Sequence, residues 1–134
     1  MSHRKPILVT AGIIVRGEEV LICQRHRIDP YGLQWEFPGG KVEDSESMEA
    51  SLERELCEEL GIEAKIGEEV YRLRHRYPDR YVEVVFFRVG SFQGDVANRV
   101  FESIEWVPRR KLAGYNFLEA DRELIARIAA GAVV

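Results

Sequence analysis

The sequence predicts a single α/β domain in which a mixed β-sheet is packed between helices. Its 134 residues are the size of one ordinary domain, so residues 1–134 are expected to form one unit. Short apolar segments rich in β-branched residues dominate the chain, and two segments with helical periodicity interrupt them. The hydrophobic share of 46% suffices for a core, while the charged share of 31% excludes a membrane-embedded protein. Many strands with few helices between them indicate a sheet covered by helices.

The strands follow from apolar runs that end at turn residues. The first two, residues 7–15 and 20–24, flank a turn at Gly17-Glu18-Glu19. A short extended piece at residues 35–37 is expected to stop at Pro38-Gly39-Gly40. Two further strands, at residues 70–76 and 81–89, are predicted on either side of a turn at Pro78-Asp79. Another strand is predicted at residues 104–107.

Two helices are predicted from their periodicity and their terminal residues. The first covers roughly residues 46–60, with Ser45 as its N-cap and Gly61 as its C-terminal stop. The second begins at a capping box formed by Asn116 and Glu119, three positions apart, and ends near Gly131. Both helices are expected to cover the sheet.

The charges are distributed unevenly along the chain. The formal net charge of the whole sequence is −4, but residues 43–63 hold nine acids and a single base, Arg54, and so carry −8. The remaining residues therefore carry +4. One short acidic segment in a mildly basic protein argues against an acidic disordered chain, and the low net charge argues against a general nucleic-acid-coating protein.

Three glutamates of the acidic segment are predicted to share one arc of the first helix. At about 100° per residue, Glu55, Glu58 and Glu59 fall within an arc of roughly 100°, at the edge of the apolar stripe. Like charges so close repel one another, and clustered carboxylates on a rigid helix suit Mg²⁺ or Mn²⁺. A solvated helix face is the alternative, but lysines four positions on, which would relieve the repulsion, are absent. The preceding Pro38-Gly39-Gly40-Lys41 offers close backbone approach and a cation, which suits a phosphate or metal site.

The spacing of these residues resembles the Nudix box. Gly40 is followed after five residues by Glu46, and after seven more by Arg54-Glu55-Leu56, Glu58-Glu59 and Gly61-Ile62. Further segments resemble the MutT-type, nucleotide-sanitising branch of this family, namely residues 11–14, 24–25, 35–41, 77–80 and 105–106. The resemblance covers nearly the whole chain and implies the Nudix α/β/α sandwich. It also implies Mg²⁺-dependent hydrolysis of a nucleoside triphosphate, such as 8-oxo-dGTP or a cytosine nucleotide, to the monophosphate and pyrophosphate.

The resemblance implies a metal site on the first helix. Glu55, Glu58 and Glu59 would bind divalent metals, Mg²⁺ or alternatively Mn²⁺, helped by the carbonyl oxygen of Gly40. Such metals neutralise the charge that develops on the phosphates and lower the pKa of the attacking water.

One carboxylate must take the proton of the attacking water. Glu55 is the expected base, and a glutamate in the loop before Trp106 is the family's other candidate. The position six residues before Trp106 is Val100 here, and Glu102 is the nearest acid. This departure from the family pattern weakens the assignment of a role to Glu102.

Three basic residues are expected to support the reaction. Arg54 would orient Glu46 or a metal-binding glutamate through a bidentate pair, so that Glu46, like Gly61, has a structural role in the box. Arg25 and Lys41 are expected to contact the phosphates. For Arg25, an exposed charge at the end of a strand is the alternative interpretation.

Three further residues are candidates for the nucleobase. Phe37 would stack on a base or belong to the core. Arg80 lies in a loop that resembles the family's base-side loop. Asp121 matches the position where guanine-cleaning members carry an Asn that reads 8-oxoguanine. An ionised Asp only accepts hydrogen bonds and favours an exposed amino group, as in cytosine or adenine, whereas a protonated Asp can also donate. The alternative for Asp121 is a first-turn acid that faces the helix dipole.

The remaining expectations concern location, partners and competing functions. Cys23 and Cys57 form no CxxC pair, which indicates buried free thiols in a reducing cytoplasm. No run of the sequence approaches transmembrane length, so no membrane association is expected. The expected partner is a small nucleotide, without a stable nucleic-acid complex, for a monomer or homodimer. The competing functions are hydrolysis of another nucleoside-diphosphate-linked substrate and nucleotide binding without catalysis.

Overall fold

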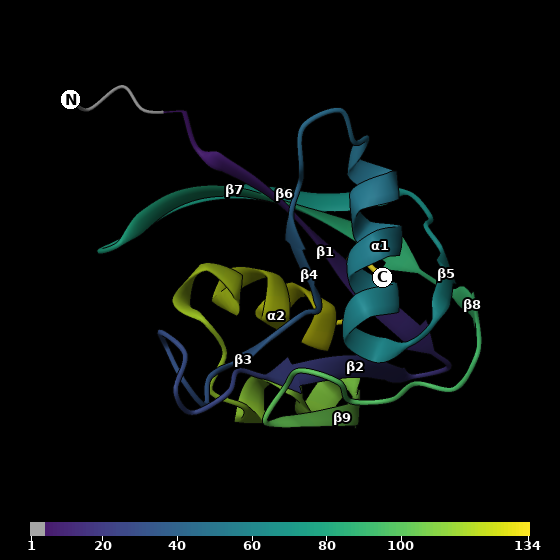
Figure 1. The fold of residues 1–134 in the computed structure, drawn as a ribbon. Coiled ribbons are helices and arrows are strands. Elements are labelled where there is room, and N and C mark those ends of the chain that lie inside the picture. Colours follow the sequence, from purple (N-terminus) through teal and green to yellow (C-terminus); the bar gives the residue numbers. More distant parts are fainter. Residues whose placement is uncertain (1–4) are drawn as a thin grey trace.

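A seven-stranded mixed sheet forms the centre of the protein, as Figure 1 shows. The computed structural model describes residues 5–134. The main path of the sheet follows the order β3 (Trp35–Glu36), β2 (Glu19–Gln24), β1 (Ile7–Arg16), β7 (Arg80–Val89) and β6 (Glu69–Tyr77). Two more strands join it, β4 (Gly39–Lys41) on β1 and β9 (Ser103–Pro108) on β2.

Strand β1 changes its partner along its length. It runs parallel to β7 from Ile7 to Ile14, and its other edge pairs antiparallel first with β4 and then, from Val15, with β2. A parallel pair needs a long crossover connection, and the segment between β1 and β7 contains helix α1 (Met48–Leu60). The change of partner brings the turn before β4 to the middle of the sheet, where the Gly12 amide donates to the Pro38 carbonyl at 2.8 Å.

The two helices cover opposite faces of this sheet, which confirms the predicted sandwich (Figure 1). Helix α1 packs its fully buried Leu52, Leu56 and Leu60 on one face, together with Ile14 of β1. Helix α2 (Arg122–Ala129) packs its apolar residues on the other face, against Ile13. Neighbouring residues of a strand point to opposite faces, so Ile13 and Ile14 belong to two separate cores. Full burial of each such side chain contributes about 1.5–3 kcal/mol.

Helix α1 begins two residues later than the residue pattern indicated. Its N-cap is Ser47, whose hydroxyl accepts from the Ala50 amide at 3.0 Å, and the predicted cap at Ser45 is wrong. Ser45 has a positive φ of 70° and belongs to the turn before the helix. The helix ends as predicted at Gly61, which has a φ of 71° and donates its amide to the Cys57 carbonyl. Glycine takes this left-handed conformation without strain.

Several short elements differ from the prediction. Residues 39–41 form strand β4 on β1, although Pro38-Gly39-Gly40 was expected to end the extended chain. The capping box at Asn116 is also wrong, because the segment holds a 3-10 helix, η2 (Glu119–Asp121), before α2 begins at Arg122. Further elements that the sequence did not indicate are β5 (Glu63–Lys65), β8 (Ser91–Gln93) and the 3-10 helix η1 (Arg109–Gly114).

The two cysteines differ in exposure, which corrects the expectation that both are buried. Cys23 lies in the core on β2, whereas Cys57 is exposed on α1. One residue after Leu56 the helix has turned by about 100°, away from the buried stripe. Within residues 5–134, no helix is long and apolar enough to cross a membrane.

Candidate active site

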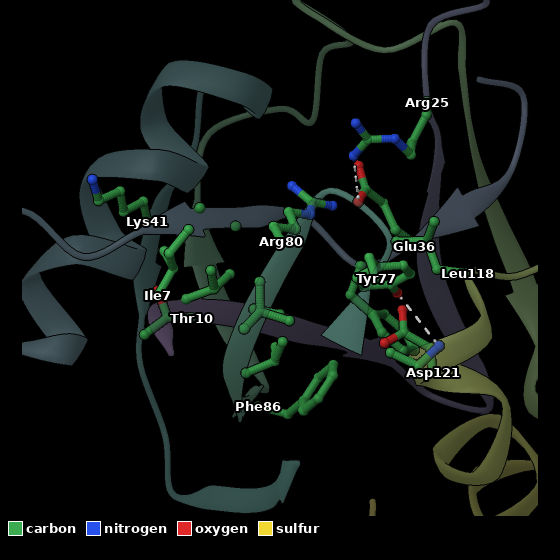
Figure 2. Close-up of a pocket in the computed structure, with 18 of the residues that line it drawn as sticks. Ile7, Thr10, Arg25, Glu36, Lys41, Tyr77, Arg80, Phe86, Leu118 and Asp121 are labelled. Carbon is green, nitrogen blue, oxygen red and sulfur yellow. Dashed lines mark hydrogen bonds and ion pairs between the residues drawn. The ribbon is translucent and has the colours of Figure 1, made fainter. Parts of the chain in front are cut away.

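A cleft of about 440 Å³ lies beside residues 39–41 of strand β4. Figure 2 shows residues that line it. One end of this cleft is lined by Gly39, Gly40, Lys41 and Glu59. The opposite end is lined by Tyr77, Leu118, Ala120 and Asp121. The structure therefore places Gly40 and Glu59 of the predicted metal site at one end of the cavity and the base candidate Asp121 at the other. Glu55 and Glu58 are not among the residues that line it.

Two glycines of β4 allow the backbone to lie directly against helix α1. A Cβ atom on Gly40 would stand 1.9 Å from Oε2 of Glu55, so any side chain there would displace this carboxylate. Gly39 has a φ of +155°, and a Cβ on it would meet the Thr10 carbonyl oxygen at 2.0 Å. The Gly39 amide donates to Oε1 of Glu59 at 3.1 Å. The glycines thus position the backbone between two of the predicted metal ligands.

Burial and mutual repulsion change the acidity of these two glutamates. Burial, followed by the charges of Glu55 and Glu36, raises the pKa of Glu59 to about 8. Burial also raises the pKa of Glu55, against the effect of the neighbouring Arg54. Two carboxylates that resist ionisation next to each other are stabilised in their charged form by a nearby cation.

The third predicted ligand points elsewhere. The side chain of Glu58 is 56% exposed and lies 3.4 Å from Nη1 of Arg54. Within residues 5–134, no three carboxylate, imidazole or thiol groups stand in an arrangement that could hold a metal ion. The donor chemistry nevertheless fits a hard divalent cation, because two crowded carboxylates meet the glycine backbone at one end of the cleft.

Arg54 forms the bidentate pair with Glu46 that the sequence predicted. Its Nε and Nη2 donate to the two oxygens of Glu46 at 2.6 and 3.0 Å. These hydrogen bonds lower the pKa of Glu46 to about 2. The same guanidinium lies 3.7 Å from Glu55, so Arg54 contacts the acidic cluster from outside the cleft lining.

Arg25 lies in the cleft but already has protein partners. Its Nε donates to the Pro30 carbonyl at 2.8 Å, and its Nη1 donates to Glu36 at 3.1 Å. Sequence reasoning did not single out Glu36 as a site residue, although a charge between the apolar Trp35 and Phe37 was a usable signal. Burial raises the pKa of Glu36, and the charge of Arg25 partly opposes this effect.

Arg80, unlike Arg25, forms no ion pair within residues 5–134. Its side chain projects into the middle of the cleft, between Lys41 and Glu36 (Figure 2). Its buried Nε has no hydrogen-bond partner among the described residues, and its guanidinium lies 5.3 Å from the ring of Tyr77. Arg80 therefore brings its positive charge to the middle of the cleft, while its buried Nε is left without a hydrogen-bond partner.

Asp121 and Phe37 form part of the inner wall. The side chain of Asp121 is almost fully buried. Asp121 directly precedes α2 and forms no side-chain cap bond there, so its position fits the first-turn alternative as well as a place in the cleft wall. Burial, followed by the charge of Glu36, raises its pKa to about 8. Phe37 is 4% exposed and packs its ring on Phe86 and Phe117, so it serves the core and the cleft wall together.

Glu102, the other candidate base, is held by a different partner. Its oxygens accept from the Arg27 amide at 3.2 Å and from Nη2 of Arg27 at 2.8 Å. These bonds lower the pKa of Glu102 to about 2. A carboxylate so strongly acidic is a poor proton acceptor.

Comparisons with known proteins identify the family of the chain. The NUDIX domain family matches residues 6–128. The chain is 38% identical over 122 residues to the CTP pyrophosphohydrolase of Escherichia coli, with 90% of each chain covered. It is 35% identical over 127 residues to the 8-oxo-dGTP diphosphatase of Haemophilus influenzae, with 93% of each covered. The solution structure of the E. coli ORF135 protein superimposes with a TM-score of 0.85 at 34% identity, covering 97% of this chain and 93% of that one. The chain therefore belongs to the NUDIX domain family of hydrolases.

Proposed function

We propose that this protein hydrolyses nucleoside triphosphates to the monophosphate and pyrophosphate, with Mg²⁺ or Mn²⁺ as cofactor. The observation that carries the proposal is the pair of crowded glutamates against the Gly39-Gly40 backbone at one end of a nucleotide-sized cleft. Relatives that the chain resembles over about nine-tenths of its length are named CTP pyrophosphohydrolase and 8-oxo-dGTP diphosphatase. We further propose that it acts on free nucleotides in the cytoplasm, where it would serve to sanitise the nucleotide pool.

The metal end of the cleft would be formed by Glu55, Glu58, Glu59 and the Gly40 carbonyl. A divalent metal bound there supplies charge neutralisation on the phosphates and a more acidic water. Glu55 is the proposed general base, because it lies in the cradle of Gly40 while Glu102 is engaged by Arg27. Arg54 acts through its neighbours, since it holds Glu46 and Glu58 in place.

The phosphates would meet two kinds of cation. Lys41 follows Gly40 on β4 and lines the metal end of the cleft. Arg80 brings its guanidinium to the middle of the cleft, whereas Arg25 is paired with Glu36. We therefore infer that Lys41 and Arg80 contribute more to phosphate attraction than Arg25 does.

The base would be read at the opposite end by Asp121, with Phe37 in the wall. A pKa of about 8 keeps this carboxyl group largely protonated near neutral pH, so that it can donate as well as accept. The sequence argument for cytosine rested on an ionised Asp, and this protonation removes its basis. Both cytosine nucleotides and 8-oxo-dGTP remain in the proposed substrate class.

Pyrophosphate release from a panel of canonical and oxidised nucleoside triphosphates tests the proposal. Glu58→Gln and Glu59→Gln are each expected to lower kcat in Mg²⁺ by at least roughly 10- to 100-fold, the loss that follows when even the hydrogen-bond partners of metal ligands are changed. Glu53→Gln is the matched control, because Glu53 is exposed on the same helix and lies outside the cleft. Full activity of both ligand variants would refute the metal site, and nucleotide binding without turnover would favour a non-catalytic domain.

A further inference from the structure

Tyr77 lies at the base end of the cleft, where β6 ends. It is 9% exposed, and its ring centroid is 5.0 Å from that of Tyr31 and 4.5 Å from that of His75. These rings fix the direction of its side chain, so that the hydroxyl reaches the segment that carries Ala120 and Asp121 (Figure 2).

The hydroxyl of Tyr77 satisfies a backbone group that has no other cap. The 3-10 helix η2 begins after Leu118, which provides no side-chain cap. The first amides of a helix have no partner within the helix and need an acceptor from elsewhere. The Ala120 amide donates to the Tyr77 hydroxyl oxygen at 3.4 Å, so Tyr77 supplies this acceptor across 43 positions of sequence.

The same hydroxyl lies within the field of Asp121. Burial, followed by the charge of Asp121, raises the pKa of Tyr77 to about 12, so the phenol stays protonated at every physiological pH. Its oxygen accepts from Ala120, which leaves its own O–H available to donate. Asp121, next in the chain to Ala120, is almost fully buried and uses its carboxyl group for no helix cap.

We propose that Tyr77 is a positioning residue for base recognition. Its hydroxyl holds the turn at residues 118–121 against the cleft wall, and so fixes the direction in which the Asp121 carboxyl group meets the nucleobase. This inference rests on the proposed function, and in particular on the base-reading role of Asp121. Discrimination between bases would then depend on two residues from different elements, Tyr77 and Asp121. The residues at the metal end of the cleft take no part in it.

Tyr77→Phe tests the inference, because it keeps the ring contacts and removes only the hydroxyl. The measured quantity is the ratio of kcat/KM for CTP to kcat/KM for 8-oxo-dGTP. We expect this ratio to change about fivefold towards unity, the effect of one neutral hydrogen bond. The change should arise in KM rather than in kcat, since the residues around Glu55 and Glu59 are untouched.

Tyr31→Phe is the matched control. Tyr31 belongs to the same ring cluster, but its hydroxyl donates to Asp79 at 2.9 Å and has no bond to η2. We expect this variant to keep the ratio of the parent protein. An equal change in both variants would overturn the inference, because it would trace the effect to general loosening of the ring cluster.

Asp121→Asn separates failure of the inference from failure of the proposed function. If Asp121→Asn alters the ratio and Tyr77→Phe does not, the role of Tyr77 is overturned while base reading by Asp121 stands. If neither variant alters the ratio although both hydrolyse nucleotides, base reading at this end of the cleft is overturned together with the inference.

Discussion

Asp121 and Glu59 stand at opposite ends of the cleft, and both are buried acids with a raised pKa of about 8. The physical cause is the same, because burial disfavours the charged form of a carboxyl group. The second-largest cause of the raised pKa is a neighbouring negative charge, which is that of Glu55 for Glu59 and that of Glu36 for Asp121. Neutral near pH 7, Asp121 can donate to a base, whereas Glu59 awaits a compensating cation.

The raised pKa of Asp121 predicts a pH-dependent cost to stability. The unfolded chain loses this proton near 3.8 and the folded protein near 8, so the free energy of unfolding falls as pH rises between these values. An asparagine side chain cannot ionise, and Asp121→Asn should therefore raise Tm relative to the parent more at pH 8 than at pH 5. One pKa unit is worth about 1.4 kcal/mol, or roughly 3–5 °C in Tm for a domain of this size.

Thermal unfolding at the two pH values measures this difference. Asp95→Asn is the control, since Asp95 is exposed, and its effect on Tm should be the same at both. A pH-independent effect of Asp121→Asn would contradict the raised pKa.

Gly40 predicts a steric effect on activity. In Gly40→Ala the added carbon would occupy a point 1.9 Å from Oε2 of Glu55 and so move this carboxylate. Misplacing a reacting group by about 1 Å costs on the order of 100-fold in rate, and we expect a loss of kcat of this size. Gly114→Ala serves as control because its added carbon meets no heavy atom within 4 Å. Steady-state kinetics on both variants decide the matter, and parental kcat in Gly40→Ala would show that the cradle is dispensable.

At the level of elements, helix α1 and strand β4 together present the acidic residues. The helix supplies a rigid scaffold with Leu52, Leu56 and Leu60 buried, and this burial fixes its rotation about its axis. The strand supplies glycines because it passes directly under the Glu55 and Glu59 side chains. The Glu46–Arg54 pair then ties the segment before the helix to its second turn.

The start of α1 predicts a specific loss of stability. Ser47→Ala removes the hydroxyl that accepts from the Ala50 amide and should lower the free energy of unfolding by about 1 kcal/mol. Ser45→Ala should change it by less than about 0.5 kcal/mol, since Ser45 provides no cap. Urea unfolding of both variants gives the two values. Equal losses would mean that the helix begins elsewhere.

Over the whole molecule, the excess of negative charge lies in one short segment. Residues 43–63 carry −8 against a net charge of −4, and the fold brings one of these acids, Glu59, to the Gly40 end of the cleft. Glu36 and Asp121 also line the cleft, and burial raises the pKa of all three carboxyl groups. Glu36 is paired with Arg25, whereas a divalent cation would compensate the crowded Glu55 and Glu59 at the Gly40 end.

Divalent metal should therefore stabilise the folded protein. A ligand that binds only the folded state adds RT ln(1 + [L]/Kd), or about 2.7 kcal/mol at a hundredfold excess over Kd. We expect Tm to rise with Mg²⁺ and to return to its starting value with EDTA. Glu59→Gln should abolish most of the rise, while sodium chloride at matched ionic strength should not reproduce it. The same Tm in Mg²⁺ and in EDTA would argue against a metal site.

The sequence by itself determined the features that depend on local geometry. Helical periodicity predicted that Glu55, Glu58 and Glu59 share one arc, and the apolar runs predicted the sheet, its main strands and the sandwich around it. In the structure Glu55 and Glu59 face the Gly39-Gly40 backbone, while Glu58 turns to Arg54. The stop at Gly61 is likewise a consequence of local residue preference, whereas the Glu46–Arg54 pair was expected from the family resemblance, with a metal-binding glutamate as the alternative partner. Strand β4 was not predicted because it exists only through its pairing with β1. The N-cap of α1 was predicted at Ser45, but it is Ser47.

Only the tertiary structure decided which charges are free. It paired Arg25 with Glu36 and Glu102 with Arg27, and it left the buried Nε of Arg80 without a hydrogen-bond partner. It also buried Asp121 and so raised the pKa of this carboxyl group to about 8. These outcomes depend on contacts between distant segments, such as the 75 positions between Arg27 and Glu102, and on burial from water. Neither quantity is encoded in local spacing, because the acidity of a side chain is set by its surroundings in the folded chain.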